Sequence, residues 1–153
     1  MNYNRIQNII PGQLPGSLTT LNAWGNQLTD ASFLKTLPNL ESLYLDQNKL
    51  SSLEDFPVLR RLTDLSLSEN QIFMIGNSLL VHELFPKLVF LNLSKNSLYD
   101  RVELLTLSEV PSLLELDLSG NPCAESPEFE ARVLEDYPQV IAVNQKYVEK
   151  DTQ

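Results

Sequence analysis

Carboxylates are the most numerous side chains in this sequence that could do chemistry. The 153 residues contain 20 Asp and Glu against 11 Lys and Arg, which gives a formal net charge of −9. Five carboxylates recur at comparable places along the chain: Asp46, Asp64, Glu69, Glu115 and Asp117. Only Lys49 and Lys95 offset them locally. Such a field would attract a basic polypeptide segment and speed its encounter with the protein.

Catalysis is a second chemistry that carboxylates can support. Asp46 and Asp64 could adjoin, and paired carboxylates do acid–base work or hold calcium. A water-washed surface, however, gives little of the desolvation that separates two pKa values. The only histidine, His82, has no nucleophile placed beside it by spacing, and the sequence has no phosphate-binding glycine loop. We therefore predict no enzyme, cofactor or metal, and keep a carboxylate-dependent hydrolase as an alternative.

Three large aromatic side chains accompany the carboxylates. Trp24, Tyr44 and Phe90 occupy positions that no buried core requires, and aromatic rings at a surface are typical binding anchors. Isolated apolar surface residues can also be without function, and Trp24 could instead fold over the open end of the core. We predict that these three rings and the five carboxylates form the partner-binding site.

A leucine pattern with a fixed period positions all of these residues. The frame L-x-x-L-x-L-x-x-N-x-L begins at Leu18, Leu40, Leu62, Leu88 and Leu113, with some substitutions. Its asparagines recur every 22 to 26 residues: Asn4, Asn26, Asn48, Asn70, Asn96 and Asn121. This period and consensus predict an α/β leucine-rich repeat solenoid, with short parallel strands on the concave face and 3₁₀ or short helices on the convex face. The asparagine amides should satisfy buried backbone groups at each turn.

Alternation along each strand separates core positions from surface positions. The residues before the second leucine are Thr20, Ser42, Asp64, Phe90 and Glu115, and those after it are Asn22, Tyr44, Ser66, Asn92 and Asp117. The two before each asparagine are Trp24, Asp46, Ser68, Ser94 and Ser119, then Gly25, Gln47, Glu69, Lys95 and Gly120. Strands lie about 4.8 Å apart, so each set should form a stripe across the concave face.

The connections divide the chain into three parts. We expect a truncated half-repeat over 1–17, five repeats over 18–123, and a C-terminal cap with a short tail over 124–153. The insertions at Asn77–Phe85 and Arg101–Val110 should each wind a helical turn or two. Pro38, Pro86 and Pro111 precede their strands at one spacing, whereas Pro57 is displaced, so that connection should differ.

The C-terminal segment carries a family resemblance. Ser126-Pro127-Glu128 predicts a helix start, and an amphipathic helix should run to Asp136 with Phe129, Val133, Leu134 and Tyr137 on one face. Pro138–Val143 then imitates the opening of one more strand, without an asparagine turn.

Together with Asn121-Pro122-Cys123, this segment resembles the cap of intracellular leucine-rich repeat proteins of the 22-residue class. That group includes the spliceosomal A-prime protein, the acidic nuclear phosphoproteins, and axonemal dynein light chains and assembly factors. Phe129-Glu130 and Val143-Asn144 depart from the pairs common in that cap, and the long acidic tail of the phosphoproteins is absent.

The N-terminal segment begins in the middle of a repeat, because Asn4 lies in register with Asn26. Either the chain is a piece of a longer solenoid or its first strand is truncated. An uncovered strand edge is a pairing hazard. We therefore expect residues 1–10 to be frayed, or covered by a partner or an additional chain.

Composition bears on the compartment and the partner. Cys123, the only cysteine, occupies a core position of the frame, and no apolar run approaches the length of a membrane span. We expect an intracellular protein, with the cytoplasm or cytoskeleton favoured and the nucleus possible. The negative charge argues against direct contact with nucleic acid or a membrane, since Arg60 and Arg61 form only an isolated pair on the convex side.

These observations favour a protein–protein adaptor without enzymatic activity. We expect the concave face to grip a helical or extended basic segment of a partner within a larger assembly, cytoskeletal or axonemal by resemblance. The alternative is a ribonucleoprotein subunit similar to the spliceosomal A-prime protein, which would reach RNA through an RNA-binding protein.

Overall fold

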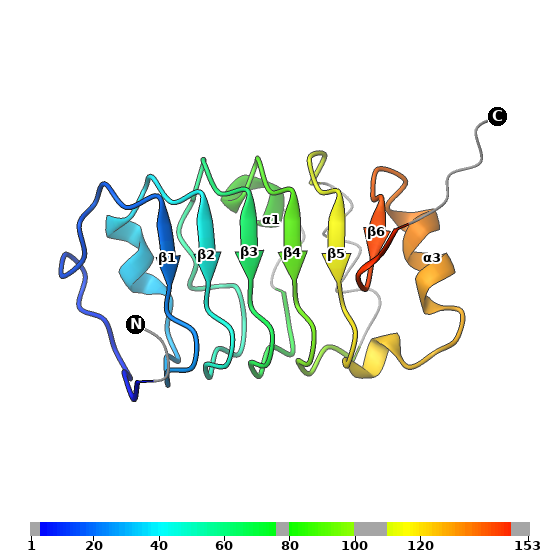
Figure 1. The fold of residues 1–153 in the computed structure, drawn as a ribbon, viewed down its shortest axis with the longest axis horizontal. Coiled ribbons are helices and arrows are strands. Elements are labelled where there is room, and N and C mark those ends of the chain that lie inside the picture. Colours follow the sequence, from blue (N-terminus) through cyan, green and yellow to red (C-terminus); the bar gives the residue numbers. More distant parts are fainter. Residues whose placement is uncertain (1–3, 76–79, 100–109, 148–153) are drawn as a thin grey trace.

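The computed structural model describes residues 4–75, 80–99 and 110–147, which form one continuous sheet with helical segments on one side (Figure 1). The 7-stranded sheet keeps the order of the sequence. Its strands are β1 (Thr20–Asn22), β2 (Ser42–Tyr44), β3 (Asp64–Ser66), β4 (Phe90–Asn92), β5 (Glu115–Asp117), β6 (Ala142–Val143) and β7 (Lys146–Tyr147). Strands β1 to β6 are parallel, as the repeat frame predicts, and β7 is antiparallel to β6.

The second leucine of the frame sets the register. Strand by strand, one leucine pairs with the next: Leu21, Leu43, Leu65, Leu91 and Leu116. Each of them is at most 5% exposed. Because one strand alone cannot bury its leucine, this line of stacked side chains is what couples each repeat to its neighbours.

The frame asparagines hydrogen-bond the turns at the strand ends. In Asn48, Nδ2 donates to Leu45 O at 2.9 Å and to Ala23 O of the preceding repeat at 3.1 Å, while Oδ1 accepts from Leu28 N at 3.0 Å. Equivalent bonds to both repeats are made by Asn70, Asn96 and Asn121. This confirms the predicted structural role, whereas Asn4, at the start of the described residues, is exposed.

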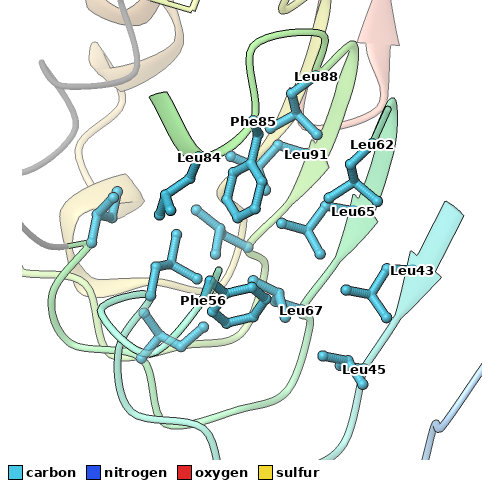
Figure 2. Packing of buried hydrophobic residues seen from close by; sticks show 14 of the residues in the cluster. Leu43, Leu45, Phe56, Leu62, Leu65, Leu67, Leu84, Phe85, Leu88 and Leu91 are labelled. Carbon is cyan, nitrogen blue, oxygen red and sulfur yellow. The ribbon is translucent and has the colours of Figure 1, made fainter. Parts of the chain in front are cut away.

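Short helical segments cover the convex side of the core. The 3₁₀ helix η1 (Ser32–Thr36) and the α-helix α1 (Leu80–Leu84) fall where the three-residue apolar spacing and the first insertion predict them. Phe56 and Phe85 meet edge to face among the leucines, with ring centroids 5.8 Å apart (Figure 2). Most of the insertion at Arg101–Val110 lies outside the described residues.

The connection around Pro57 is built differently, as expected, because residues 51–61 contain no helix where the neighbouring connections have η1 and α1. Its turn into β3 is nevertheless the same. Leu62 N donates to Leu59 O at 3.3 Å, as Leu40 N donates to Leu37 O at 3.4 Å behind Pro38. Arg60 and Arg61 occupy the turn positions that Pro38 and Asn39 fill there. The i to i+3 bond forms without proline, because many residue types are compatible with such a turn.

The C-terminal cap closes the solenoid with a helix and a hairpin. After the 3₁₀ turn η3 (Pro122–Ala124), helix α3 spans Phe129–Asp136. The helix starts two residues later than predicted, because Phe129 N donates to Ser126 O in a turn, and the N-cap residue Glu128 makes no capping side-chain bond within the described residues. Phe129, Val133 and Tyr137 are buried as predicted, and Leu134 is partly buried against the core.

Strand β7 was not predicted. It follows β6 through Asn144 and Gln145, whose φ angles of 51° and 66° suit a two-residue hairpin turn. Asn144 Oδ1 accepts from Leu118 N at 2.8 Å, in place of the carbonyl that a further parallel strand would supply. Asn144 therefore serves the hairpin turn and not the asparagine turn of the repeat frame, which was not expected in the cap.

Two further expectations need correction. From Asn4 onward the N-terminal segment is held against the first repeat rather than frayed, since Gln27 N donates to Ile6 O at 2.9 Å and Ile6 and Ile9 pack against the core. Cys123 is partly rather than fully buried, and desolvation raises the pKa of its thiol. Residues 1–3 and the tail at 148–153 lie outside the described chain.

Candidate binding site on the concave face

The sheet face that points away from the leucine core is called the concave face here, after the horseshoe curvature of such repeats. Two hollows lie on it, and together they collect seven of the eight predicted site residues. The N-terminal hollow is lined by Asn22, Trp24, Tyr44, Asp46, Ser68, Glu69 and Asn92. The C-terminal hollow is lined by Phe90, Glu115, Leu116, Asp117, Ala142 and Gln145.

The N-terminal hollow is the larger one, with a volume of about 340 Å³. Trp24 follows β1 and Tyr44 ends β2, and both are partly exposed rather than sealed in the core. The alternative in which Trp24 covers the open end of the core is therefore not what the structure shows. Aromatic rings from two neighbouring repeats thus line the N-terminal hollow together with Asp46 and Glu69. This is what stripes of surface residues across the concave face would produce.

Asp46 is fixed by the repeat that follows it. Its Oδ1 accepts from Ser66 Oγ and from Ser68 N, the latter at 3.0 Å. In three other repeats, the backbone N–H equivalent to Ser68 N donates to an Asn or Asp side chain two residues earlier in the same strand. These bonds run from Trp24 N to Asn22, from Ser94 N to Asn92 and from Ser119 N to Asp117. Since β3 has Ser66 at that place, Asp46 of the preceding repeat supplies the acceptor. The Asp46 carboxylate is thus held in one orientation beside the rings.

Glu69 stands at the exposed rim of the N-terminal hollow. It accepts from Gln47 Nε2 at 3.2 Å and lies 3.7 Å from Lys95 Nζ, with the Lys95 and Glu69 side chains 68% and 44% exposed. All three residues have positive φ, between 53° and 57°, at the same position of three successive repeats. An ion pair this exposed contributes little to stability and leaves Glu69 accessible to a partner.

The C-terminal hollow is shallow, with a volume of about 30 Å³. Phe90 and Glu115 pair in register across β4 and β5 and are partly exposed. The prediction that Asp117 offers its carboxylate to a partner needs correction, because this residue is only 4% exposed. Its Oδ1 accepts from Ser119 Oγ at 2.7 Å and its Oδ2 from Gln145 Nε2 at 3.0 Å. Asp117 therefore holds the cap against the last repeat instead of offering a free carboxylate.

Asp64 lines neither hollow and does not pair with Asp46. It is partly exposed in β3, with Ser42 and Phe90 as its register neighbours. Asp46 lies four residues beyond Ser42, roughly 13 Å along the strand direction. The expected carboxylate pair is therefore wrong, and with it the geometric basis for the hydrolase alternative.

No cluster of three or more metal-ligating side chains occurs within residues 4–75, 80–99 and 110–147. In the same residues, no helix has the length and apolar character needed to cross a bilayer. His82 is partly buried on α1, away from either hollow.

Six lining residues were not among the predicted site residues, and two of them, Leu116 and Ala142, are buried core side chains. Asn22, Ser68 and Asn92 belong to the surface stripes, so the alternation placed them on this face, but their neutral side chains gave no reason to select them. Gln145 lies in the cap hairpin, which the repeat frame does not describe. No sequence signal places it beside Asp117.

Comparison with known protein families matches residues 32–153 to the family described as Leucine-rich repeat. The chain is 32% identical over 133 residues to cilia- and flagella-associated protein 410 of Mus musculus, covering 86% of this chain and 43% of that protein. It is 29% identical over 133 residues to an acidic leucine-rich nuclear phosphoprotein 32-related protein of Plasmodium falciparum, covering 84% of this chain and 47% of that protein. The chain thus spans less than half the length of these two relatives.

A solved structure extends the similarity to a third group. The crystal structure of the Drosophila melanogaster SNF/U2A' complex contains a chain that superposes with a TM-score of 0.79 at 25% identity. The match covers 86% of this chain and 75% of that chain. These similarities agree with the resemblance found in the cap and the repeats.

Proposed function

The chain belongs to the leucine-rich repeat family, and from that premise we propose that it is a protein–protein adaptor that binds a basic segment of its partner on the concave face. Solenoids of this kind typically act as interaction modules through their extended concave surfaces. We assign the contact to Trp24, Tyr44 and Phe90 with the carboxylates of Asp46, Glu69, Asp64 and Glu115. Asp117 is proposed to position the C-terminal hollow rather than to touch the partner.

One observation carries this proposal. Trp24 and Tyr44 share a hollow with Asp46 and Glu69, so apolar anchors and negative charge meet at one place. Binding hot spots are enriched in large aromatic residues that fill or line pockets. The surrounding carboxylates add attraction for a cationic segment and discriminate against an acidic one.

The spacing of the two hollows constrains the partner. The lining residues centre the N-terminal hollow between β2 and β3 and the C-terminal hollow on β5, so roughly 12 Å separates them in the direction across the strands, at about 4.8 Å per strand. A helix laid across the strands would span that distance with roughly eight residues, at 1.5 Å each. An extended segment would need roughly four. In both cases the two anchor residues fall on one face of the segment.

The assembly in which the adaptor works is proposed from its relatives. We favour a cytoskeletal or ciliary setting inside the cell, which the similarity to a cilia- and flagella-associated protein over 86% of the chain supports. The alternative is a nuclear ribonucleoprotein, supported by the likeness to a chain solved as a complex of SNF and U2A'. In that case the chain would bind an RNA-binding protein, and RNA only through it.

Differential capture tests the proposed surface. Tagged wild-type protein and two variants, Trp24→Ala and Asp64→Lys with Glu115→Lys, are incubated with lysate of the native source, and captured proteins are identified by mass spectrometry. We expect a partner that wild type retains and both variants lose. Tyr99→Ala and Glu54→Lys are matched controls, since both residues are exposed outside the two hollows. Capture that the controls abolish and the site variants preserve would move the binding site off the concave face.

Fractionation of the captured material separates the two assemblies. Ciliary or motor proteins that co-purify independently of ribonuclease treatment support the favoured assembly. Recovery of small nuclear RNA together with an RNA-binding protein supports the alternative.

A further inference from the structure

The N-terminal hollow offers the surroundings of a cation with a flat face. Two rings, Trp24 and Tyr44, line it together with the Asp46 and Glu69 carboxylates. A guanidinium group stacks on aromatic faces and presents several donors to carboxylates at once. We infer that this hollow takes the side chain of a single arginine from the partner. The inference rests on the proposed function and specifies its anchor.

Asp46 is prepared for such a ligand. Its bonds to Ser66 Oγ and Ser68 N both fall on Oδ1. Oδ2 is therefore the acceptor that remains for an incoming donor, among the interactions of the described chain. Because the carboxylate is already oriented, binding costs little further side-chain entropy at this residue.

The neutral groups of the hollow are largely engaged. Asn22 and Asn92 each accept a backbone N–H through Oδ1, and Ser68 Oγ lies 2.7 Å from Ser94 Oγ. Within the described chain the acceptors left for a ligand are mainly Asp46 Oδ2 and the exposed Glu69 carboxylate, which also contacts Gln47 and Lys95, so the hollow favours a charged donor over a neutral one.

Size and hydration favour arginine among the possible cations. About 340 Å³ lies at the low end of ligand pockets, which suits one side chain rather than a turn of helix. Lysine carries a strongly hydrated point charge and gains less from two flat rings than a guanidinium does. A divalent metal is disfavoured, since no three ligating side chains gather anywhere in the described residues.

Tryptophan fluorescence provides a direct test, because Trp24 is the only tryptophan of the chain. The protein is titrated with N-acetyl-arginine amide and, in parallel, with the citrulline and lysine equivalents. We expect a saturable change in emission with arginine and about tenfold weaker binding with citrulline, which keeps the shape and lacks the charge. Asp46→Asn keeps the Oδ1 acceptor for Ser66 and Ser68 and should weaken arginine binding by about tenfold. Glu54→Gln removes the same charge at an exposed residue outside both hollows and should change nothing.

Citrulline or lysine binding as tightly as arginine would overturn the inference, and so would an Asp46→Asn protein that folds and binds normally. If Asp46→Asn fails to fold, Glu69→Gln at the exposed rim and Tyr44→Leu carry the same test, and undiminished arginine binding in both overturns it. If arginine causes no change in tryptophan emission while partner capture still depends on Trp24, the arginine site alone is refuted. Capture that survives all concave-face variants refutes the proposed function itself.

Discussion

Each of the frame asparagines Asn48, Asn70, Asn96 and Asn121 makes the hydrogen bonds that the backbone loses where a strand ends. Asn70 donates to Leu45 O and Leu67 O, both at 3.0 Å, and accepts from Leu50 N at 3.1 Å. The amide is one of the few side-chain groups that donate twice and accept at once. Aspartate or serine could not reproduce this set, which is why the frame specifies asparagine at this position.

Asn70→Ala should therefore destabilise the protein strongly. The substitution leaves Leu50 N and two buried carbonyl groups without their partner, and each unsatisfied group costs about 1–3 kcal/mol. Partial access of water reduces the sum, so we expect a loss of about 2–4 kcal/mol in the free energy of unfolding, measured by urea denaturation. Asn39→Ala is the matched control, since its amide makes an exposed bond to Gly16 O. Similar losses in the free energy of unfolding of both variants would contradict a specific structural role of the frame asparagines.

The thiol of Cys123 gives a prediction about pH. Burial raises its pKa above the ordinary value, and a hydrogen bond from its own backbone opposes this effect only in part. The folded protein should thus hold less thiolate at pH 8 than the unfolded chain and react several-fold more slowly with a disulfide reagent. The sign for stability follows, because the unfolded state loses its proton first as the pH rises through the ordinary cysteine range, and the free energy of unfolding falls. Equal reaction rates with and without urea would contradict this account.

The sequence predicted the face on which several site residues lie, but not the exposure or the pairing of others. Trp24 and Tyr44 could be placed on the concave face from alternation, because strand parity determines the direction of a side chain. Parity does not determine exposure. Asp117 points to the same face but is covered by Gln145, a residue of the cap hairpin that no repeat pattern describes. Asp46 and Asp64 were expected to be able to adjoin on neighbouring strands, whereas the register separates them by four residues along the strand.

At the scale of the repeat, one turn position adopts the left-handed backbone region throughout the solenoid. Its φ is 74° at Gly25 and Gly120 and between 53° and 57° at Gln47, Glu69 and Lys95. Residues other than glycine are uncommon there. The three central repeats thus tolerate a strained backbone at this position, where Glu69 lines the N-terminal hollow and contacts Gln47 and Lys95 from the neighbouring repeats.

Gly120→Ala tests whether this turn can accept a side chain in the last repeat. A Cβ at Gly120 would lie 2.9 Å from Lys95 Cγ and 3.3 Å from Lys95 Cα, on top of the positive φ. We expect thermal unfolding to show a loss of about 2–3 kcal/mol, of which about 1–2 kcal/mol reflects backbone conformation. Gly12→Ala isolates the backbone cost, since Gly12 has a φ of 90° and nothing within 4 Å of an added Cβ. Equal losses would show that the contact with Lys95 is relieved without cost.

Element types were more predictable than element ends. The frame predicts each parallel strand, because the leucine spacing repeats and stacking is its only means of burial. The start of α3 was placed too early, since Ser126 forms a turn rather than a cap. Strand β7 could not be foreseen, because its turn depends on positive φ at Asn144 and Gln145, which few sequence signals mark outside Asn-Gly or Asp-Gly.

At the scale of the whole molecule, carboxylates outnumber cations on the concave face, where Lys95 pairs with Glu69. The concave face carries Asp46, Asp64, Glu69 and Glu115, while Arg61 and Lys87 line a separate hollow with Glu41 and Thr63, beside the turns that lead into β3 and β4. The concave face therefore carries a local negative field as part of the net charge of −9. An approaching basic segment experiences that field before any contact forms.

Charge and aromatic contacts should therefore act on different rate constants for the partner recovered by capture. Asp64→Lys with Glu115→Lys should lower the association rate and flatten its dependence on salt, because these carboxylates steer the encounter at the periphery. Trp24→Ala should raise the dissociation rate and leave association nearly unchanged, because a ring packed in the N-terminal hollow contributes only after docking. Surface plasmon resonance at low and high salt measures both rate constants. Glu54→Lys with Glu41→Lys makes the same change in net charge at residues that line neither concave hollow. If that control slowed association as much as the site variants do, the steering would come from total charge and not from the concave face.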